Sequence, residues 1–234
     1  MPEAAAPGQM GATVPVTPAV QDRLGVKEAI DFWDERHRVR GELLSGGDLT
    51  WDHAGNEMLY AVRLGRLVDI LGGLSSPAAP LRVLDAGCGK GFYTRAFTRF
   101  GYFADGIDSS PYAIKSCRRE KVASERYAVS TIEDWSPGYL YDAVVAVDVL
   151  FHLMDDEVWD RSLRNLARLV RLGGLLVVAD HDSDEDRLRG SYQITRSTPR
   201  YHAVAEAEGL RPEGFVPYRF RGTPVGFHVF SRVR

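Results

Sequence analysis

The sequence has few cysteines, little net charge and no long apolar run, and each absence excludes a class of protein. Cys88 and Cys117 are the only cysteines, which is too few for a disulfide framework and favours a reducing compartment. The net charge of −3 gives no general attraction to nucleic acid or to an anionic membrane. No apolar segment reaches the roughly 18 residues of a membrane span. We therefore expect a cytoplasmic protein that binds neither nucleic acid nor a membrane.

The chain is long enough for one ordinary domain with a sizeable core. It has 234 residues, of which 44% are hydrophobic and 26% charged, as in globular proteins. Residues 1–20 are rich in Ala, Pro, Gly and Thr and lack the charged start and apolar core of a signal peptide. We expect a disordered leader over residues 1–20, followed by a single domain over residues 21–234.

The segment 83–92, Val-Leu-Asp-Ala-Gly-Cys-Gly-Lys-Gly-Phe, predicts a strand, a glycine turn and a helix. Its three alternate glycines let the backbone turn tightly and approach a ligand closely. The dinucleotide fingerprint G-x-G-x-x-G would need glycine where Phe92 stands, and the phosphate loop G-x-x-x-x-G-K-[ST] is absent. Asp85 at the strand tip would repel a pyrophosphate. It suits a cationic ligand without phosphate, such as S-adenosylmethionine.

The residues 85–91, Asp-Ala-Gly-Cys-Gly-Lys-Gly, resemble motif I of the class I S-adenosylmethionine-dependent methyltransferases. As a pattern the resemblance extends over roughly residues 54–234. It implies a Rossmann-like α/β fold, a doubly wound and mostly parallel sheet of seven strands whose last strand runs antiparallel. It also implies that residues 21–75 form an N-terminal helical lid over the acceptor pocket and residues 80–234 the cofactor-binding core.

Apolar periodicity predicts the same alternation of strands and helices. Strands are expected at 81–85, 102–107, 127–130, 142–147 and 174–179. Helices are expected at 22–44, 54–71, 91–100, 110–119, 155–170 and 198–209. The chain then closes with a hairpin whose last strand alternates Val225, Phe227 and Val229. Alternating strands and helices favour a parallel sheet with helices on both faces.

The resemblance assigns cofactor contacts to the ends of successive strands. The main chain at the three glycines would lie against the methionine part, with Asp85 near its ammonium group. Asp108, after the second strand, would accept hydrogen bonds from both ribose hydroxyls, because one carboxylate offers several lone pairs. The spacing of Asp108 also fits a dinucleotide fold, so this residue alone does not discriminate. Ser109 beside it could instead cap the next helix.

Further contacts are implied after the third and fourth strands. Asp134, in the segment 132–135, would accept from the adenine amino group while Trp135 covers the ring; a solvated loop with a packed tryptophan is the alternative. Asp148 belongs to the segment 147–152, which faces the methyl group in related enzymes. The predicted cofactor-binding residues are Trp33, Tyr60, Asp85, Gly87, Cys88, Gly89, Gly91, Asp108, Ser109, Glu133, Asp134, Trp135 and Asp148.

Methyl transfer to an oxygen, or to a nitrogen that starts protonated, requires a base, and histidine titrates near neutral pH. His152 after the fourth strand and His181 after the fifth are the predicted catalytic residues. His37 could reach the site from the lid. For His152, the alternative is a structural ring packed beside Phe151.

Residues 180–200 carry many charges of both signs. Four arginines with Tyr192 could hold an anionic acceptor; they are Arg187, Arg189, Arg196 and Arg200. A surface flap with some acceptor contacts is the interpretation that we prefer. The acidic run at 180–186 is more typical of a solvated loop than of a Mg²⁺ site, so no metal is expected.

The sequence therefore predicts an S-adenosylmethionine-dependent methyltransferase, of class EC 2.1.1, acting on a small molecule of specialised metabolism. The nucleic-acid motif Asn/Asp-Pro-Pro-aromatic is missing after the fourth strand. Alternatives are C-methylation of an anionic metabolite and a noncatalytic cofactor-binding module. A nicotinamide-dependent oxidoreductase is disfavoured by Phe92 and Asp85. A homodimer is compatible with this interpretation.

Overall fold

The computed structural model describes residues 24–48, 50–74, 80–121 and 124–233; the predicted leader at 1–20 lies outside them. The main sheet contains β1 (Arg82–Ala86), β2 (Phe103–Asp108), β3 (Arg126–Val129), β4 (Tyr141–Ala146), β5 (Val170–His181), β8 (Leu210–Pro217) and β9 (Val225–Arg232). The helices are α1 (Val26–Val39), α2 (Glu42–Gly46), α3 (His53–Gly72), α4 (Phe92–Arg99), α5 (Pro111–Glu120), α6 (Asp156–Arg168) and α7 (Thr198–Ala207), with a 3-10 turn η2 (Leu150–His152). A small hairpin pairs β6 (Arg187–Leu188) with β7 (Ile194–Thr195).

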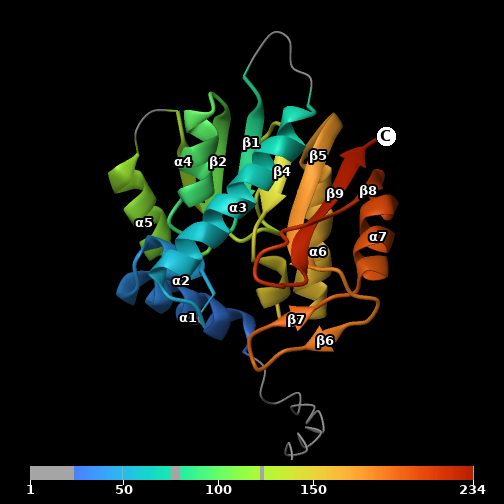
Figure 1. The fold of residues 1–234 in the computed structure, drawn as a ribbon. Helices are drawn as coiled ribbons and strands as arrows, with labels where there is room; N and C mark the ends of the chain where they lie inside the picture. Colours follow the sequence, from blue (N-terminus) through green and yellow to red (C-terminus); the bar gives the residue numbers. More distant parts are fainter. Residues whose placement is uncertain (1–23, 49, 75–79, 122–123, 234) are drawn as a thin grey trace, which may run out of the picture.

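The strands of the main sheet follow the order β3-β2-β1-β4-β5-β9-β8 (Figure 1). β1 to β5 pair in parallel, whereas β9 lies antiparallel between β5 and β8. This arrangement confirms the predicted doubly wound sheet with an antiparallel last strand. In such sheets the carboxyl ends of the strands meet at one edge, and ligands bind in the crevice outside that edge.

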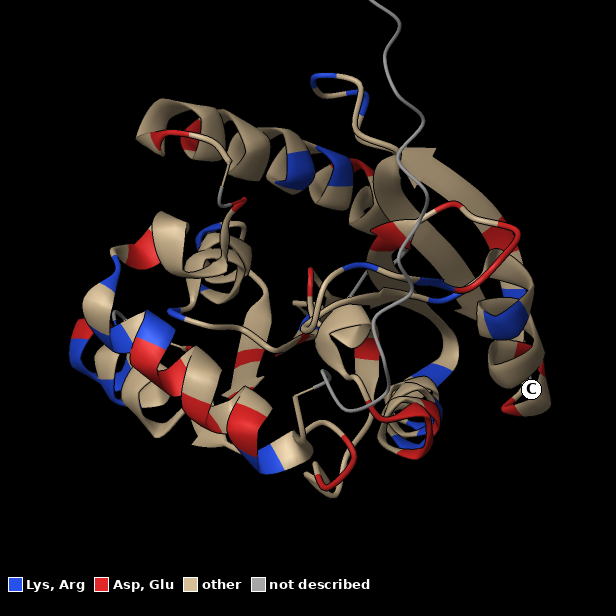
Figure 2. Ribbon diagram, turned by 90° about the horizontal axis from the view of Figure 1, so that it is seen from below, with Lys and Arg blue, Asp and Glu red and all other residues tan. Residues whose placement is uncertain are grey.

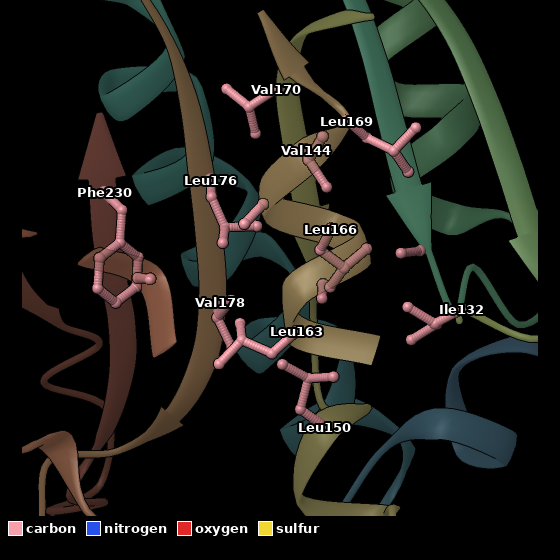
Figure 3. Packing of buried hydrophobic residues seen from close by; sticks show 14 of the residues in the cluster. Ile132, Val144, Leu150, Leu163, Leu166, Leu169, Val170, Leu176, Val178 and Phe230 are labelled. Atoms are coloured by element: carbon pink, nitrogen blue, oxygen red, sulfur yellow. The ribbon is translucent and has the colours of Figure 1, made fainter. Parts of the chain in front are cut away.

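Two apolar layers hold the helices against the sheet. On one face α6 packs against β5, and Figure 3 shows Leu163 and Leu166 of the helix beside Val178 of the strand. On the other face, Leu67 of α3 and Phe97 of α4 belong to a second cluster of fully buried side chains. Each such side chain contributes about 1.5–3 kcal/mol through burial. The two layers fix the strand ends from which the loops emerge.

The fold departs from the predicted elements at two places. The helix expected at 22–44 is broken into α1 and α2, because the backbone is extended at Arg40 and Gly41. The buried Arg36 side chain of α1 connects the two helices, because it donates to the carbonyl oxygens of Ser45 and Gly47 at the C-terminal end of α2. The β6–β7 hairpin lies where we predicted a surface flap, for which no strands were expected individually.

The exposed surface carries no single sign of charge. Figure 2, seen from the side on which α1 lies, shows acidic and basic residues interspersed along the helices. No described helix has the length and apolar character that crossing a membrane requires.

Candidate active site

A cavity opens at the carboxyl ends of β1, β2 and β4. It encloses about 1310 Å³ of space, part of it open to solvent. The glycine loop after β1, the ends of β2 and β4, and η2 form its floor and sides, and α1 and α3 supply the rest. This is the position at which an open α/β sheet binds its ligands. We call the part at residues 87–90 and 108–109 the cofactor end, and the part at residues 24–33 and 149–154 the acceptor end.

The glycine loop is tied to the neighbouring strand. The backbone N–H groups of Gly87 and Cys88 both donate to the carbonyl oxygen of Ile107 at 2.8 Å. Gly87 has φ +75°, and a Cβ at that position would lie 2.2 Å from a methyl group of Val149. A side chain therefore fits neither the backbone nor the space, so the glycine pattern reflects the local geometry.

Asp108 links the end of β2 to this loop. One carboxylate oxygen accepts from the Gly89 N–H at 2.9 Å, and the other accepts from the Ser110 N–H at 2.8 Å. The carboxylate lines the cavity and is half-buried. Since each carboxylate oxygen has two lone pairs, Asp108 retains acceptor capacity for a hydroxylated ligand.

A buried ion pair lies in the wall of the cavity between α3 and the segment after β4. The guanidinium of Arg63 pairs with the carboxylate of Asp148 and stands 5.1 Å from the ring centre of Tyr218. Burial opposes the charge, but Asp148 and the surrounding tyrosines more than offset it and hold the pKa of Arg63 above its ordinary value. Asp148 has φ +56°, which costs about 1–3 kcal/mol in a non-glycine residue, and such strained residues tend to cluster at active sites and ligand clamps.

This ion pair leaves polar atoms without partners. Arg63 Nε, Asp148 Oδ1 and the hydroxyl of Tyr93 are buried and have no hydrogen-bond partner among the described residues. All three residues line the cavity. Buried polar atoms nearly always have partners in folded proteins, so unpaired ones beside a cavity indicate a place for a polar ligand.

His152 lines the acceptor end. Its ring lies 4.6 Å from the ring of Trp33 on α1, and its Nδ1 is 2.9 Å from the carbonyl oxygen of Tyr192. Burial lowers the pKa of His152 to about 4, so the ring is neutral at physiological pH. Because a carbonyl oxygen can only accept, Nδ1 must carry the proton, and Nε2 then has the free lone pair.

Contacts along α1 attach the lid to the cofactor end. Asp34 accepts from the Ser110 hydroxyl at 2.6 Å and from the Tyr112 N–H at 2.9 Å, at the start of α5. His37 is buried above the glycine loop, and its Cε1 would lie 3.1 Å from a Cβ at Gly89. The helix therefore covers the loop through both polar and packing contacts.

Ten of the predicted site residues come together around this cavity. They are Trp33, Tyr60, Gly87, Cys88, Gly89, Asp108, Ser109, Glu133, Asp148 and His152. His37, named above as an alternative base, also lines it.

Five of the predicted site residues lie outside the cavity lining; they are Asp85, Gly91, Asp134, Trp135 and His181. Asp85 is 1% exposed beneath the glycine loop and accepts from the Thr94 hydroxyl at 2.6 Å. Burial raises the pKa of Asp85 to about 7. The strand tip turns this side chain toward α4 and away from the cavity lining, and its contact with the ligand ammonium group stays a prediction.

Packing places three other predicted residues away from the cavity lining. Asp134 is exposed and accepts from the Thr131 hydroxyl, whereas Trp135 packs against the α6 layer and donates to the Tyr141 hydroxyl at 3.1 Å. His181 is buried beside Asp180, and its Nδ1 is 3.2 Å from that carboxylate. Their roles toward a ligand stay predictions.

The arginines of residues 187–200 also point elsewhere, since none lines the cavity. Arg196 is fully buried and pairs with Asp156 at 3.0 Å. Arg200 pairs with Asp186 at 2.6 Å. The alternative of an arginine grip on an anionic acceptor therefore has no support in this arrangement. From this region, the main chain of Tyr192 reaches the acceptor end through its contact with His152.

Sequence reasoning missed Arg63. The signal was present, because Arg63 falls in the apolar stripe of α3, three residues after Tyr60 and four before Leu67, and all three are buried. A charged residue at a buried helical position needs a partner, and that requirement points to a site.

Known proteins resemble this chain over the residues that form the glycine loop and the strands around the cavity. The family described as "Methyltransferase domain" matches residues 84–178. Ubiquinone biosynthesis O-methyltransferases are similar: that of Methylocella silvestris is 37% identical over 107 residues, covering 44% of this chain and 41% of its own. That of Xanthomonas campestris is 32% identical over 136 residues, covering 55% and 54%. The chain thus spans about half the length of these curated relatives.

Solved structures share the fold. Magnesium protoporphyrin IX methyltransferase from Synechocystis PCC 6803, with bound S-adenosylmethionine, has a TM-score of 0.67 at 18% identity and covers 93% of this chain and 100% of its own. The 1,6-didemethyltoxoflavin-N1-methyltransferase of Burkholderia thailandensis has a TM-score of 0.63 at 18% identity, with 98% and 100% covered. The sheet order, the glycine loop and the matched family agree. Residues 84–178 therefore match the methyltransferase domain family, and the chain shares its fold with S-adenosylmethionine-dependent methyltransferases of known structure.

Proposed function

We propose that this protein transfers the methyl group of S-adenosylmethionine to a small apolar acceptor that bears a dissociable O–H or N–H group. The observation that carries the proposal is one continuous cavity. It joins the glycine loop, Asp108 and the Arg63–Asp148 pair to an end where His152 is the lining base. Bound S-adenosylmethionine would supply a methyl group already activated by its sulfonium.

The chemistry of the donor set fits this ligand. The amino-acid end of S-adenosylmethionine is a zwitterion. The Arg63–Asp148 ion pair complements it, because each partner has one polar atom without a hydrogen bond. The free Arg63 Nε would donate to the carboxylate, and the free Asp148 Oδ1 would accept from the ammonium group. Asp108 would hold the ribose hydroxyls, and the lining residues Ile132 and Glu133 would take the adenine contacts predicted for their neighbours.

The acceptor end is mostly apolar. Its lining includes Val26, Ala29 and Ile30 of α1, together with Leu153 and Met154 after η2. Apolar walls bind an uncharged body by burial and leave few polar groups to orient it. An acceptor held here would present its O–H or N–H to Nε2 of His152, which can take the proton as the methyl group arrives.

The names of the relatives support the same class of acceptor. Ubiquinone biosynthesis O-methyltransferases methylate at oxygen and the toxoflavin enzyme at a ring nitrogen, by their names. We propose the same choice of atoms here, in specialised metabolism. C-methylation of an anionic metabolite is less well supported, because none of the four arginines that would hold it lines the cavity, and Arg196 and Arg200 are ion-paired elsewhere.

Calorimetry tests the proposal. S-adenosylmethionine and its demethylated product are expected to bind, and NAD is not. Asp108→Ala should weaken binding about tenfold or more, a loss of about 1.4 kcal/mol or more. Asp134→Ala is the matched control: it removes a nearby acidic residue outside the cavity and should leave affinity within about twofold. Tight NAD binding without S-adenosylmethionine binding would refute the proposal.

Turnover needs a separate assay, because a noncatalytic binding module would pass the calorimetry. A metabolite extract incubated with enzyme and S-adenosylmethionine should yield a product heavier by one methyl group. His152→Ala should reduce its rate of formation by about 10²–10⁴-fold, the usual contribution of a general base. Binding without any methylated product would favour the noncatalytic module.

A further inference from the structure

The ring of His152 is enclosed by segments far apart in the chain. Trp33 of α1 lies 4.6 Å from it on one side, and Tyr192 of the β6–β7 hairpin stacks on it at 5.8 Å with an angle of 18° between the rings. Tyr192 also supplies the carbonyl oxygen that accepts from Nδ1 at 2.9 Å. One hairpin residue thus contacts both the face and one nitrogen of the ring.

The hairpin is itself attached to the lid. The backbone N–H of Leu24, just before α1, donates to the carbonyl oxygen of Ser191 at 3.2 Å, and Phe32 of α1 lies 6.3 Å from the Tyr192 ring. Within the hairpin, the Arg189 N–H donates to the Gln193 carbonyl oxygen at 2.8 Å. The loop that carries Tyr192 is therefore closed on itself and bonded to the segment that covers the cavity.

The tautomer of His152 depends on this hairpin. The Nδ1–H form leaves Nε2 as the acceptor of a proton, and no hydrogen bond to Nε2 occurs within the described part of the chain. If the hairpin moved away, Nδ1 would lose its carbonyl partner and the ring could adopt either neutral tautomer. The Nε2–H form could not take a proton at that atom.

We propose that Tyr192 is a positioning residue for the proposed general base, holding His152 in the Nδ1–H tautomer when the hairpin and α1 are closed over the acceptor. The base is then competent in the closed state, in which water is excluded from the cavity. This inference rests on the proposed function, since it assigns His152 the role of proton acceptor. It gives a role to the β6–β7 hairpin, whose residues 187–195 do not line the cavity.

The experiment measures the His152 ring directly by nitrogen-15 and carbon-13 NMR, with the signal assigned through His152→Gln. Wild-type protein should show the Nδ1–H tautomer and a pKa near 4. Tyr192→Ala keeps the main-chain carbonyl but removes the stacked ring that holds the hairpin against His152, so we expect the hairpin to open and Nδ1 to lose its partner. The variant should then show a mixture of tautomers and a pKa moved upward toward the ordinary value of 6.5, because the ring meets water. The charged group that acts on this ring, Arg36, is unchanged in the variant.

Two further variants separate positioning from damage to the hairpin. Tyr192→Phe keeps the stacked ring and should restore the wild-type tautomer and pKa. Gln193→Ala alters the neighbouring side chain of the same loop and should leave both unchanged. A Tyr192→Ala protein that kept the Nδ1–H tautomer and the low pKa would overturn the proposal, as would a Tyr192→Phe protein that behaved like Tyr192→Ala.

The outcome is independent of the calorimetry. If S-adenosylmethionine fails to bind wild-type protein, the proposed function fails whatever the NMR shows. If it binds wild-type and Tyr192→Ala protein equally well while the tautomer is unchanged, the positioning role alone fails. In the extract assay, Tyr192→Ala should form product at a rate between those of wild type and His152→Ala, and Tyr192→Phe at the wild-type rate.

Discussion

The two ends of the cavity differ in how far apart in the sequence their walls lie. At the cofactor end, the glycine loop follows β1 and contacts Asp108 of β2, about twenty residues later. At the acceptor end, Leu24 contacts Ser191, and His152 lies between α1 and the β6–β7 hairpin. The first wall is made by neighbouring strands and their turns. The second exists only when segments from both ends of the chain meet over the sheet.

This difference predicts different consequences of mutation. Changes at the cofactor end should affect stability and cofactor affinity together, because its charges are buried within the sheet and its covering helices. Changes at the acceptor end should affect lid closure and turnover while leaving the core intact, since its contacts lie on the outside of the sheet.

The largest effect is expected at the ion pair beneath the cofactor end. Arg63→Leu leaves the buried Asp148 carboxylate uncompensated and should lower the free energy of unfolding by about 3–5 kcal/mol, measured by urea denaturation. Cofactor binding should be lost as well. Arg66→Leu, on the same helix but outside the cavity lining, is the matched control and should change both quantities little.

A double variant separates the two roles of this pair. Arg63→Met with Asp148→Asn removes both charges and should recover most of the lost stability without recovering affinity for S-adenosylmethionine. If the double variant bound the cofactor as tightly as wild type, the pair would be structural and the proposed contact with the amino-acid end would be wrong.

The next effect concerns pH, through Asp85 beneath the glycine loop. Burial raises the pKa of Asp85 to about 7 in the folded protein, above the ordinary value of 3.8. Between about pH 4 and pH 7 the folded state therefore binds more protons than the unfolded state, and this group makes stability fall as pH rises. Asp85→Asn removes the titration, so its stability relative to wild type should rise across this range, by at most about 4 kcal/mol.

Urea denaturation of wild type and Asp85→Asn at several pH values checks this prediction. A stability difference that stays flat from about pH 5 to about pH 8 would show that Asp85 remains ionised when folded. That result would return Asp85 to its role as a charged partner of the ligand, as the sequence alone predicted.

The smallest effect should occur where the lid is attached. Asp34→Ala removes two hydrogen bonds to the start of α5. It should lower the free energy of local opening of α1 by about 1–3 kcal/mol, which is measured as faster exchange of the α1 amide hydrogens. Cofactor affinity should change only a few-fold. Asp31→Ala on the same helix removes an exposed ion pair with Lys27 and is the control. Equal exchange in the two variants would mean that Asp34 does not hold the lid.

The sequence predicted the architecture better than the side-chain directions. Periodicity located every strand of the main sheet, and the glycine pattern located the cavity, because both depend on short-range backbone geometry. Asp134 and Trp135 were assigned to the ligand because they follow a strand end, yet the chain turns there and exposes one and buries the other. His181 lies outside the cavity lining for a related reason, since β5 carries it into a polar cluster with Asp180.

From the sequence alone came the doubly wound sheet, the glycine turn after the first strand, and the resemblance to a methyltransferase family. These follow from local rules: backbone conformation, apolar spacing and the residue types that a turn tolerates. Tertiary structure alone decided that Arg63 meets Asp148 and that the Tyr192 carbonyl meets His152. The members of each pair lie 40 residues or more apart along the chain. Burial, which only the folded chain provides, determines whether the ion pair stays charged and whether His152 stays neutral.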